Sequence, residues 1–248
     1  MVSFCVFVLT NTNGYCRYSN EDPPTLKERS LAWGIEADMN SKYLWRGINY
    51  NDGLVLQPNL WLGWGDFSVG LWGSMTVYDR YQEVHRNELD LVMNYFYSLG
   101  KLEMEHSAMF YYYLGQDDSP PTGELYVGIG YPIGDFKLLS SATVDFLAYP
   151  GACFFEHGFA YEKNLNDRLT WTSSLVVGWA NGKFNETYVG TETTSANLIG
   201  VRIELTYSSA GSFYFKPHIE LNRIIDKGLV PYLGKYPWYG GLLIGIEI

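Results

Sequence analysis

A two-residue alternation of apolar and polar side chains runs through most of the chain and constrains its fold more than any other feature. It begins in residues 31–50, where odd positions such as Trp33 and Ile35 are mostly apolar and even positions such as Glu36 and Asp38 are mostly polar or charged. Successive side chains of a strand point to opposite faces, whereas a helix would repeat every 3.6 residues. The segment is therefore predicted to be one long strand with two different faces.

The same alternation recurs along the rest of the chain, so the sequence predicts about twelve strands and an all-β fold. The composition agrees with this class, because aromatic residues make up 17% of the chain and charged residues only 18%. The predicted strands after the first cover residues 54–64, 67–78, 88–98, 102–114, 124–131, 136–146, 154–162, 168–179, 197–207, 213–222 and 240–248.

The connections between these segments are short and long in strict alternation. Short turns fall at Gly65-Asp66, Gly100-Lys101, Gly134-Asp135, 164–167 and Ala210-Gly211, and longer polar loops cover 49–53, 79–87, 115–123, 149–152, 180–196 and 225–239. An up-and-down barrel of the outer membrane has short turns at its periplasmic rim and long loops at the other. Residues 30–248 are therefore predicted to form one up-and-down antiparallel transmembrane β-barrel.

The apolar face is predicted to contact lipid. A soluble barrel would turn that face inward, but eight strands already enclose an interior filled by side chains, and twelve enclose one too wide for them. Aromatic residues near the strand ends, including Trp33, Tyr43 and Trp45, fit the interfacial girdles of a membrane barrel. No apolar run approaches the roughly 20 residues of a membrane helix. The expected location is the bacterial outer membrane, with outer-membrane lipid as a partner.

Residues 1–29 differ in composition from the rest of the chain. An apolar run, VSFCVFVL, is followed by polar residues, a Pro23-Pro24 pair and mixed charges. This segment is interpreted as a secretory signal or as a disordered tail, and both readings stay open.

The first three predicted strands resemble a known family. The residues concerned are Ser41-Lys42-Tyr43-Leu44-Trp45-Arg46-Gly47, then Asp52-Gly53, Gln57-Pro58 and Gly70-Leu71-Trp72-Gly73-Ser74. They resemble the "Ser-x-Tyr-x-x-Arg-Gly", Asp-Gly, Gln and "Gly-x-Trp-x-Ser" pattern of the TorF-like porins of Gram-negative bacteria. Membrane-barrel chains usually end on an aromatic residue, and this chain differs because it ends on Ile246-Glu247-Ile248. The resemblance implies an outer-membrane barrel and a porin-like role.

The polar face is predicted to line the barrel interior, with acids outnumbering bases. The formal net charge of -10 argues against a nucleic-acid partner. The expected function is passive diffusion of small hydrophilic solutes or ions through a net acidic channel. The alternative is a plugged barrel, in which paired charges close the interior and loops 180–196 and 225–239 give a structural or surface-binding role. The predicted pore-lining residues are Glu36, Asp38, Lys42, Arg46, Asp90, Glu103, Glu105, Asp145, Glu156, Arg202, Glu204, Lys216 and Glu220.

Catalytic and metal chemistry is not expected. A lipase-type site would need a serine beside a histidine. His85 falls in a predicted long loop, His106 and His157 have no suitable serine on their own strands, and His218 is interpreted as part of a network in the interior. Three cysteines, Cys5, Cys16 and Cys153, give no metal-binding or disulfide pattern. The chain is therefore expected to be no enzyme and to need no cofactor or metal, while the pattern leaves the number of subunits open.

Overall fold

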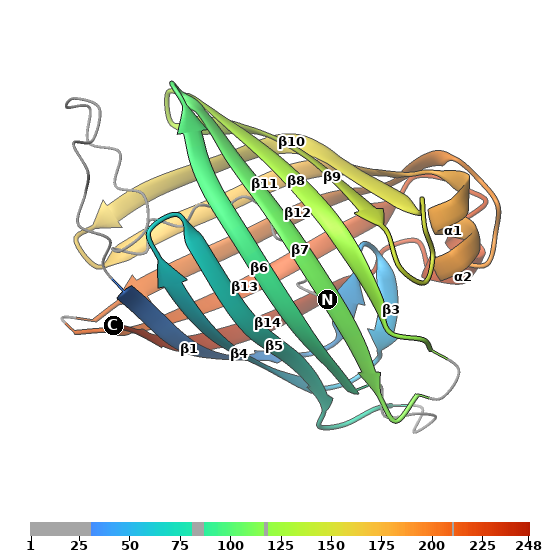
Figure 1. Cartoon of the computed structure of the whole chain (residues 1–248), viewed down its shortest axis with the longest axis horizontal. Coiled ribbons are helices and arrows are strands. Elements are labelled where there is room, and N and C mark those ends of the chain that lie inside the picture. The colour runs from blue at the N-terminus through green and yellow to red at the C-terminus, as the bar shows by residue number, and fades with distance from the viewer. Residues whose placement is uncertain (1–30, 81–86, 117–118, 210) are drawn as a thin grey trace.

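Twelve antiparallel strands close into a barrel in the computed structural model, which describes residues 31–80, 87–116, 119–209 and 211–248 (Figure 1). Each strand pairs with its neighbours along the chain, and the first closes the ring against the last. The barrel strands are β1 (Leu31–Asn40), β4 (Val55–Trp64), β5 (Phe67–Thr76), β6 (Asn87–Leu99), β7 (Leu102–Leu114), β8 (Thr122–Ile133), β9 (Phe136–Asp145), β10 (Cys153–Asn166), β11 (Leu169–Ala180), β12 (Ser195–Ser208), β13 (Phe213–Ile224) and β14 (Trp238–Glu247).

The predicted up-and-down topology is confirmed, as is the alternation of short and long connections. Closure follows from the pairing of β1 with β14, in a register that runs from Gly34 opposite Glu247 to Asn40 opposite Gly241. A closed ring leaves no unpaired strand edge, which lipid could not satisfy. The two-residue turns that begin at Gly65, Gly100 and Gly134 use positive φ values of 60°, 64° and 61°, which glycine adopts without strain.

The outward face of the barrel is apolar. Large hydrophobic side chains remain exposed along the strands, for example Leu60 on β4, Leu125 on β8 and Ile244 on β14. In the described part of the chain no helix is both long and apolar enough to cross a membrane. A closed barrel with an apolar outer belt is the architecture of transmembrane barrels, and it places the chain in the bacterial outer membrane.

This placement predicts a depth-dependent effect of charge on the outer face. Leu242, near the middle of β14, and Leu99, at the periplasmic end of β6, are both outward and exposed. Replacing Leu242 by Arg is expected to lower the free energy of unfolding by about 2–4 kcal/mol, and Leu99→Arg by about 0–1 kcal/mol. Denaturant titration in lipid vesicles measures both variants. Equal losses would contradict the assignment of this face to lipid.

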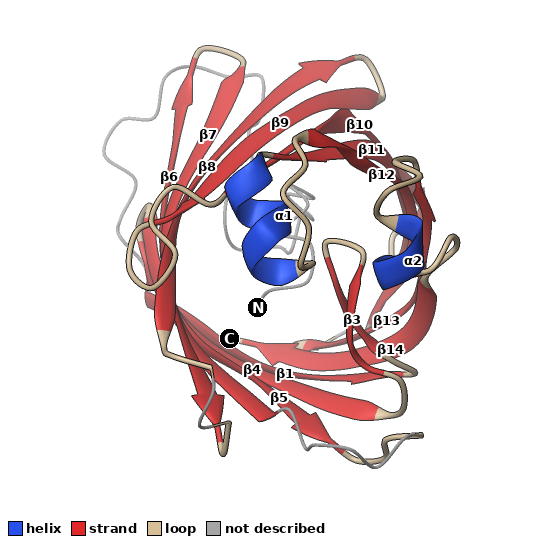
Figure 2. Ribbon diagram, turned by 90° about the vertical axis from the view of Figure 1, so that its right-hand side faces the viewer, coloured by secondary structure: helices blue, strands red, loops and turns tan. Residues whose placement is uncertain are grey.

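One predicted strand is wrong in its length. The alternation of residues 31–50 predicts one strand, but β1 ends at Asn40 and the chain turns inward at Ser41 and Lys42. Residues 43–51 form a small hairpin of β2 (Tyr43–Trp45) and β3 (Ile48–Asn51), which lies inside the ring of barrel strands (Figure 2). Tyr43 and Trp45 are each only 2% exposed, so the prediction that they face lipid is also wrong.

Two short helices accompany the hairpin at the same end of the barrel. Helix α1 (Gly182–Tyr188) lies across the barrel mouth, and α2 (Val230–Leu233) lies nearer the wall (Figure 2). Both belong to the long loops predicted at 180–196 and 225–239. The inner hairpin (residues 43–51) and α1 are together called the plug below. The segment 1–29 lies outside the described residues.

Candidate functional site

The tip of the inner hairpin has an unusual backbone. Strands β2 and β3 are joined by two residues, Arg46 and Gly47, with φ values of 51° and 82°. Positive φ at both central residues is the mark of a type I′ hairpin turn, in which asparagine or glycine is usual. Among the described residues Arg46 is the only non-glycine residue with positive φ. Local strain of this kind is tolerated where the surrounding contacts hold the residue in place.

Arg46 is held by a carboxylate of the barrel wall. Its Nη1 and Nη2 atoms donate to Oε1 and Oε2 of Glu124 on β8, at 2.7 and 2.9 Å. The hydroxyl of Tyr111 on β7 donates to the same Oε2 at 2.8 Å. Burial acts to lower the pKa of the Arg46 guanidinium, but the charge of Glu124 and its hydrogen bonds outweigh burial and leave that pKa raised. The pair is therefore a charged, two-pronged clamp.

Aromatic rings enclose the guanidinium around this clamp. The Cζ atom of Arg46 lies 4.3 Å from the ring centre of Trp45, 4.9 Å from Phe154 and 5.5 Å from Phe184. Trp45 belongs to the hairpin, Phe154 to β10 and Phe184 to α1. A cation over an aromatic face is attracted by the ring quadrupole, and more strongly where water is excluded. The hairpin tip thus fills a site that is built mainly by other elements.

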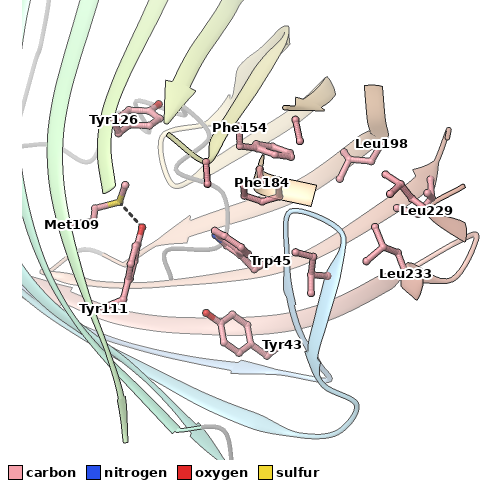
Figure 3. Packing of buried hydrophobic residues seen from close by; sticks show 14 of the residues in the cluster. Tyr43, Trp45, Met109, Tyr111, Tyr126, Phe154, Phe184, Leu198, Leu229 and Leu233 are labelled. Atoms are coloured by element: carbon pink, nitrogen blue, oxygen red, sulfur yellow. Dashed lines mark hydrogen bonds between the residues drawn. The ribbon is translucent and has the colours of Figure 1, made fainter. Parts of the chain in front are cut away.

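The hairpin and α1 pack together through aromatic contacts (Figure 3). Trp45 lies 5.6 Å from Phe184 and meets Tyr188 edge-on at 5.2 Å, both measured between ring centres. Gly47 packs beside the wall, where a Cβ atom would come within 3.0 Å of Leu198 and 3.1 Å of Ile224. The buried cluster therefore joins the plug to β12 and β13.

Helix α1 is fixed by polar contacts of its own. The side chain of Asn181 caps it by accepting from the Phe184 amide at 2.9 Å. Asn185, fully buried, exchanges hydrogen bonds with Asn197 on β12 at 2.7 and 3.1 Å. Tyr188 donates to Asp145 at the end of β9, at 3.2 Å. These contacts anchor α1 to the barrel wall without using the inner hairpin.

The base of the hairpin is tied to the neighbouring rim. Tyr43 donates to Glu88 on β6 at 2.8 Å, and Lys42 forms an ion pair with Asp52. The alternation predicts that Lys42 lines the interior from a barrel strand, but Lys42 lies in the turn that follows β1. Its partner lies just beyond β3, so Lys42 links the two ends of the inner hairpin.

Predicted interior residues of β1 do face inward. Glu36 accepts from Tyr214 on β13 at 2.6 Å and from Asn59 on β4 at 2.8 Å. Asp38 lies 3.6 Å from the Nε2 atom of His218. These contacts bridge strands on both sides of β1 and lie on the side of the plug nearer the periplasmic turns.

Glu103 and Glu105 on β7 also take inward positions. Glu103 pairs with Lys137 of β9 at 2.7 Å, across the width of β8. Glu105 is buried, at 7% exposed, and accepts from Ser107 at 3.3 Å. Both residues therefore contribute carboxylates to the interior surface of β7.

The wall formed by β12 and β13 carries both signs of charge. Arg202 donates to the Tyr239 hydroxyl at 2.9 Å and to Glu204 at 3.3 Å, and it lies 3.8 Å from Glu220. Tyr239 in turn donates to Glu220 at 3.0 Å. Lys216, on the same face of β13, is buried. This network compensates the charge of Arg202 within the wall.

The remaining predicted residues differ in their surroundings. Asp145 lies at the loop rim, where it accepts from Thr122 at 2.6 Å and from Tyr188. Asp90 is fully buried on the interior face of β6. Glu156 points inward from β10, and its buried Oε1 atom hydrogen-bonds to none of the described groups. Asp145 thus serves the loops, while Asp90 and Glu156 contribute to the interior.

Sequence reasoning missed the aromatic half of the site. The alternation places Trp45 and Tyr43 on the lipid-facing side, and it assigns no role to Phe154, Phe184 and Tyr188. A signal was available at Arg46-Gly47, because a residue followed by glycine between two short apolar runs is a typical two-residue hairpin turn. That signal was outweighed by the unbroken two-residue alternation on either side.

The described histidines contact side chains on other strands of the barrel. His157 on β10 contacts the Ser140 hydroxyl of β9 at 3.0 Å on the outward face. His106 contacts Tyr97 at 3.1 Å, and His218 contacts Asn40 at 2.9 Å. In the described part of the chain no carboxylate hydrogen-bonds to His157, and no group of three or more His, Cys, Asp or Glu side chains could hold a metal ion. His85 lies outside the described residues.

Comparison with known proteins shows which fold the chain shares with solved structures. No family model and no curated protein sequence matches the chain. Among solved structures the KdgM porin aligns with a TM-score of 0.54 at 11% identity, over 85% of this chain and 97% of that one. The NanC porin aligns at 0.54 and 9%, over 87% and 98%. An outer membrane channel from Pseudomonas putida F1 aligns at 0.50 and 9%, over 92% and 100%. The chain therefore has the barrel fold of outer-membrane porins.

Proposed function

We propose that the protein is a porin-like outer-membrane channel, closed at rest by its own inner hairpin, for passive diffusion of small hydrophilic solutes or ions. The observation that carries this proposal is the Arg46–Glu124 clamp, a buried ion pair that fastens the tip of the inner hairpin to the barrel wall. The proposal includes no covalent step, cofactor or metal. Kinship with the TorF-like porins is part of it, and the Tyr43-Leu44-Trp45-Arg46-Gly47 segment of the hairpin supports that kinship.

A net acidic interior supports a preference for cations. Acidic side chains face inward on β6 and β7, including Asp90, Glu103 and Glu105. In the ring order these strands lie half a circuit from β12 and β13, which carry Arg202 and Lys216 beside their own carboxylates. Fixed charges along a pore set its ion preference, so excess carboxylates favour cations.

The charge preference gives a testable prediction. Replacing Glu36 by Gln and Asp38 by Asn is expected to lower cation over anion selectivity, because two interior negative charges are lost. The reversal potential across a planar bilayer in a salt gradient measures this selectivity. Asp135→Asn, which removes one negative charge from an exposed periplasmic turn, serves as the control. An unchanged reversal potential in the double variant would refute the role of these carboxylates.

Conductance tests the proposed function itself. Purified protein in planar bilayers is expected to show rare single-channel openings, which become frequent when the inner hairpin is weakened. Absence of current steps in the native protein and in every hairpin variant would overturn the channel.

The second candidate function is a permanently plugged barrel with a structural or surface-binding role. The observation in its favour is the buried aromatic cluster that joins the inner hairpin, α1 and the wall. This alternative predicts a barrel that stays closed when the Arg46–Glu124 clamp is broken, so the same recordings separate the two functions.

A further inference from the structure

The carboxylate of Glu124 is a recognition site that the chain itself occupies. Its side chain is only 1% exposed, both oxygens accept from the Arg46 guanidinium, and the Tyr111 hydroxyl donates to one of them. Two parallel N–H···O bonds match the planar fork of a guanidinium and not the point charge of an ammonium group. The geometry at Glu124 is thus specific for one type of cation.

Most of this site remains when the hairpin leaves. Glu124 and Tyr111 belong to β8 and β7, Phe154 to β10 and Phe184 to α1, which has its own anchors at Asn185 and Tyr188. Trp45 is the aromatic neighbour that would depart together with Arg46. A vacated site would therefore keep the carboxylate, a hydroxyl donor and two aromatic rings.

We propose that Glu124, Tyr111, Phe154 and Phe184 form a binding site for solutes that carry a guanidinium group, and that such a solute opens the channel by replacing Arg46. The binding itself does not depend on conduction, whereas the opening rests on the proposed channel function. The net charge of -10 favours the approach of a cation. Arg46 competes as a tethered ligand at an effective concentration in the mM range, so the free solute must act at comparable concentrations.

The backbone of the hairpin tip favours this exchange. Arg46 has a positive φ of 51° in the two-residue turn, and unfolding of that turn when the hairpin leaves would remove the cost of this conformation. A guanidinium solute gains the contacts of the site without this strain. The structure thus provides a reason why a free ligand can compete with a tethered one.

Equilibrium binding tests the site without reference to current. The full-length Arg46→Ala variant, in detergent micelles, is titrated calorimetrically with argininamide and, in parallel, with lysinamide. Argininamide is expected to bind with a Kd on the order of 1 mM, at least tenfold tighter than lysinamide. Adding Glu124→Gln to this variant is expected to weaken argininamide binding at least tenfold, whereas Glu186→Gln on the exposed face of α1 should leave it unchanged. An absence of saturable binding, or equal binding of argininamide and lysinamide, would contradict the proposed guanidinium-binding site.

Single-channel recording of the native protein tests the opening. Argininamide at several mM is expected to raise the open probability at least fivefold, and lysinamide at equal concentration and ionic strength to leave it near its starting value. If argininamide binds specifically and the protein conducts, an unchanged open probability would contradict the proposal that the solute opens the channel. Specific binding together with an absence of current in every variant would overturn the proposed channel and leave the site standing.

Discussion

Replacing residues 43–51 by a short Gly-Ser linker is expected to produce a barrel that stays open. The ends of the strands that flank this segment are neighbours, because Asn40 of β1 is paired with Val55 of β4. A short linker can therefore join them without disturbing the wall. The change removes Trp45 and Arg46 from the interior, and with them the contacts that the inner hairpin makes with α1 and Glu124. We expect the closed state to become rare and the mean current per barrel to rise at least tenfold.

Planar-bilayer recording at fixed protein concentration measures this rise. A second variant, with residues 43–51 replaced by nine Gly and Ser residues, keeps the loop length and controls for simple shortening. Both variants should show the same increase in mean current, because both lack the packing of the inner hairpin against α1 and the Arg46–Glu124 ion pair. A shortened barrel with the current of the native protein would show that the inner hairpin is not what closes it.

Breaking the clamp alone is expected to shift the closed-to-open ratio strongly. Removing one partner of a buried ion pair leaves the other without compensation, which costs about 3 kcal/mol and corresponds to roughly 100-fold in an equilibrium. The side chains of Arg46 and Glu124 are 11% and 1% exposed, so solvent screens the pair little. Arg46→Ala and Glu124→Gln are therefore each expected to lower the closed-to-open ratio by about that factor. Arg46→Lys should recover only part of it, because an ammonium group cannot form both bonds.

A double-mutant cycle tests whether Arg46 and Glu124 change the closed-to-open ratio through their contact with each other or independently. If Arg46 and Glu124 act on each other, the double variant should open little more than either single variant, with a coupling of about 1–3 kcal/mol. Arg168→Ala, in an exposed periplasmic turn, and Glu186→Gln, on α1, remove the same charges elsewhere and should leave the ratio unchanged. Additive effects of the two substitutions would argue that each residue acts through a different partner.

The barrel could be predicted from the sequence because its two determinants are local. Alternation along each strand reports which side chains share a face, and glycine turns such as Gly65-Asp66 and Gly134-Asp135 report where hairpins close. The interior positions of Glu36, Asp38 and Arg202 follow from that alternation once the apolar face is assigned to lipid.

The plug could not be predicted in the same way. A barrel strand and a hairpin inside the barrel both alternate every two residues, so Tyr43 and Trp45 continue the pattern of β1 although the chain has turned at Ser41 and Lys42. Arg46 is 78 residues from Glu124 along the chain, and their meeting depends on barrel closure. Phe184, in a long loop, acquires its role only through contact with this hairpin.

The accessibility of Ile48 while the channel gates tests most directly whether the inner hairpin closes the channel. Ile48 lies on β3 next to the hairpin tip and is 8% exposed. In a variant with Ile48→Cys and the three native cysteines replaced by Ser, a charged thiol reagent is added during single-channel recording. We expect the introduced cysteine to react at least tenfold faster during openings than during closures, and the modified hairpin to be unable to close the channel. Equal reaction rates in both states, or modification without effect on current, would contradict a channel closed by its inner hairpin.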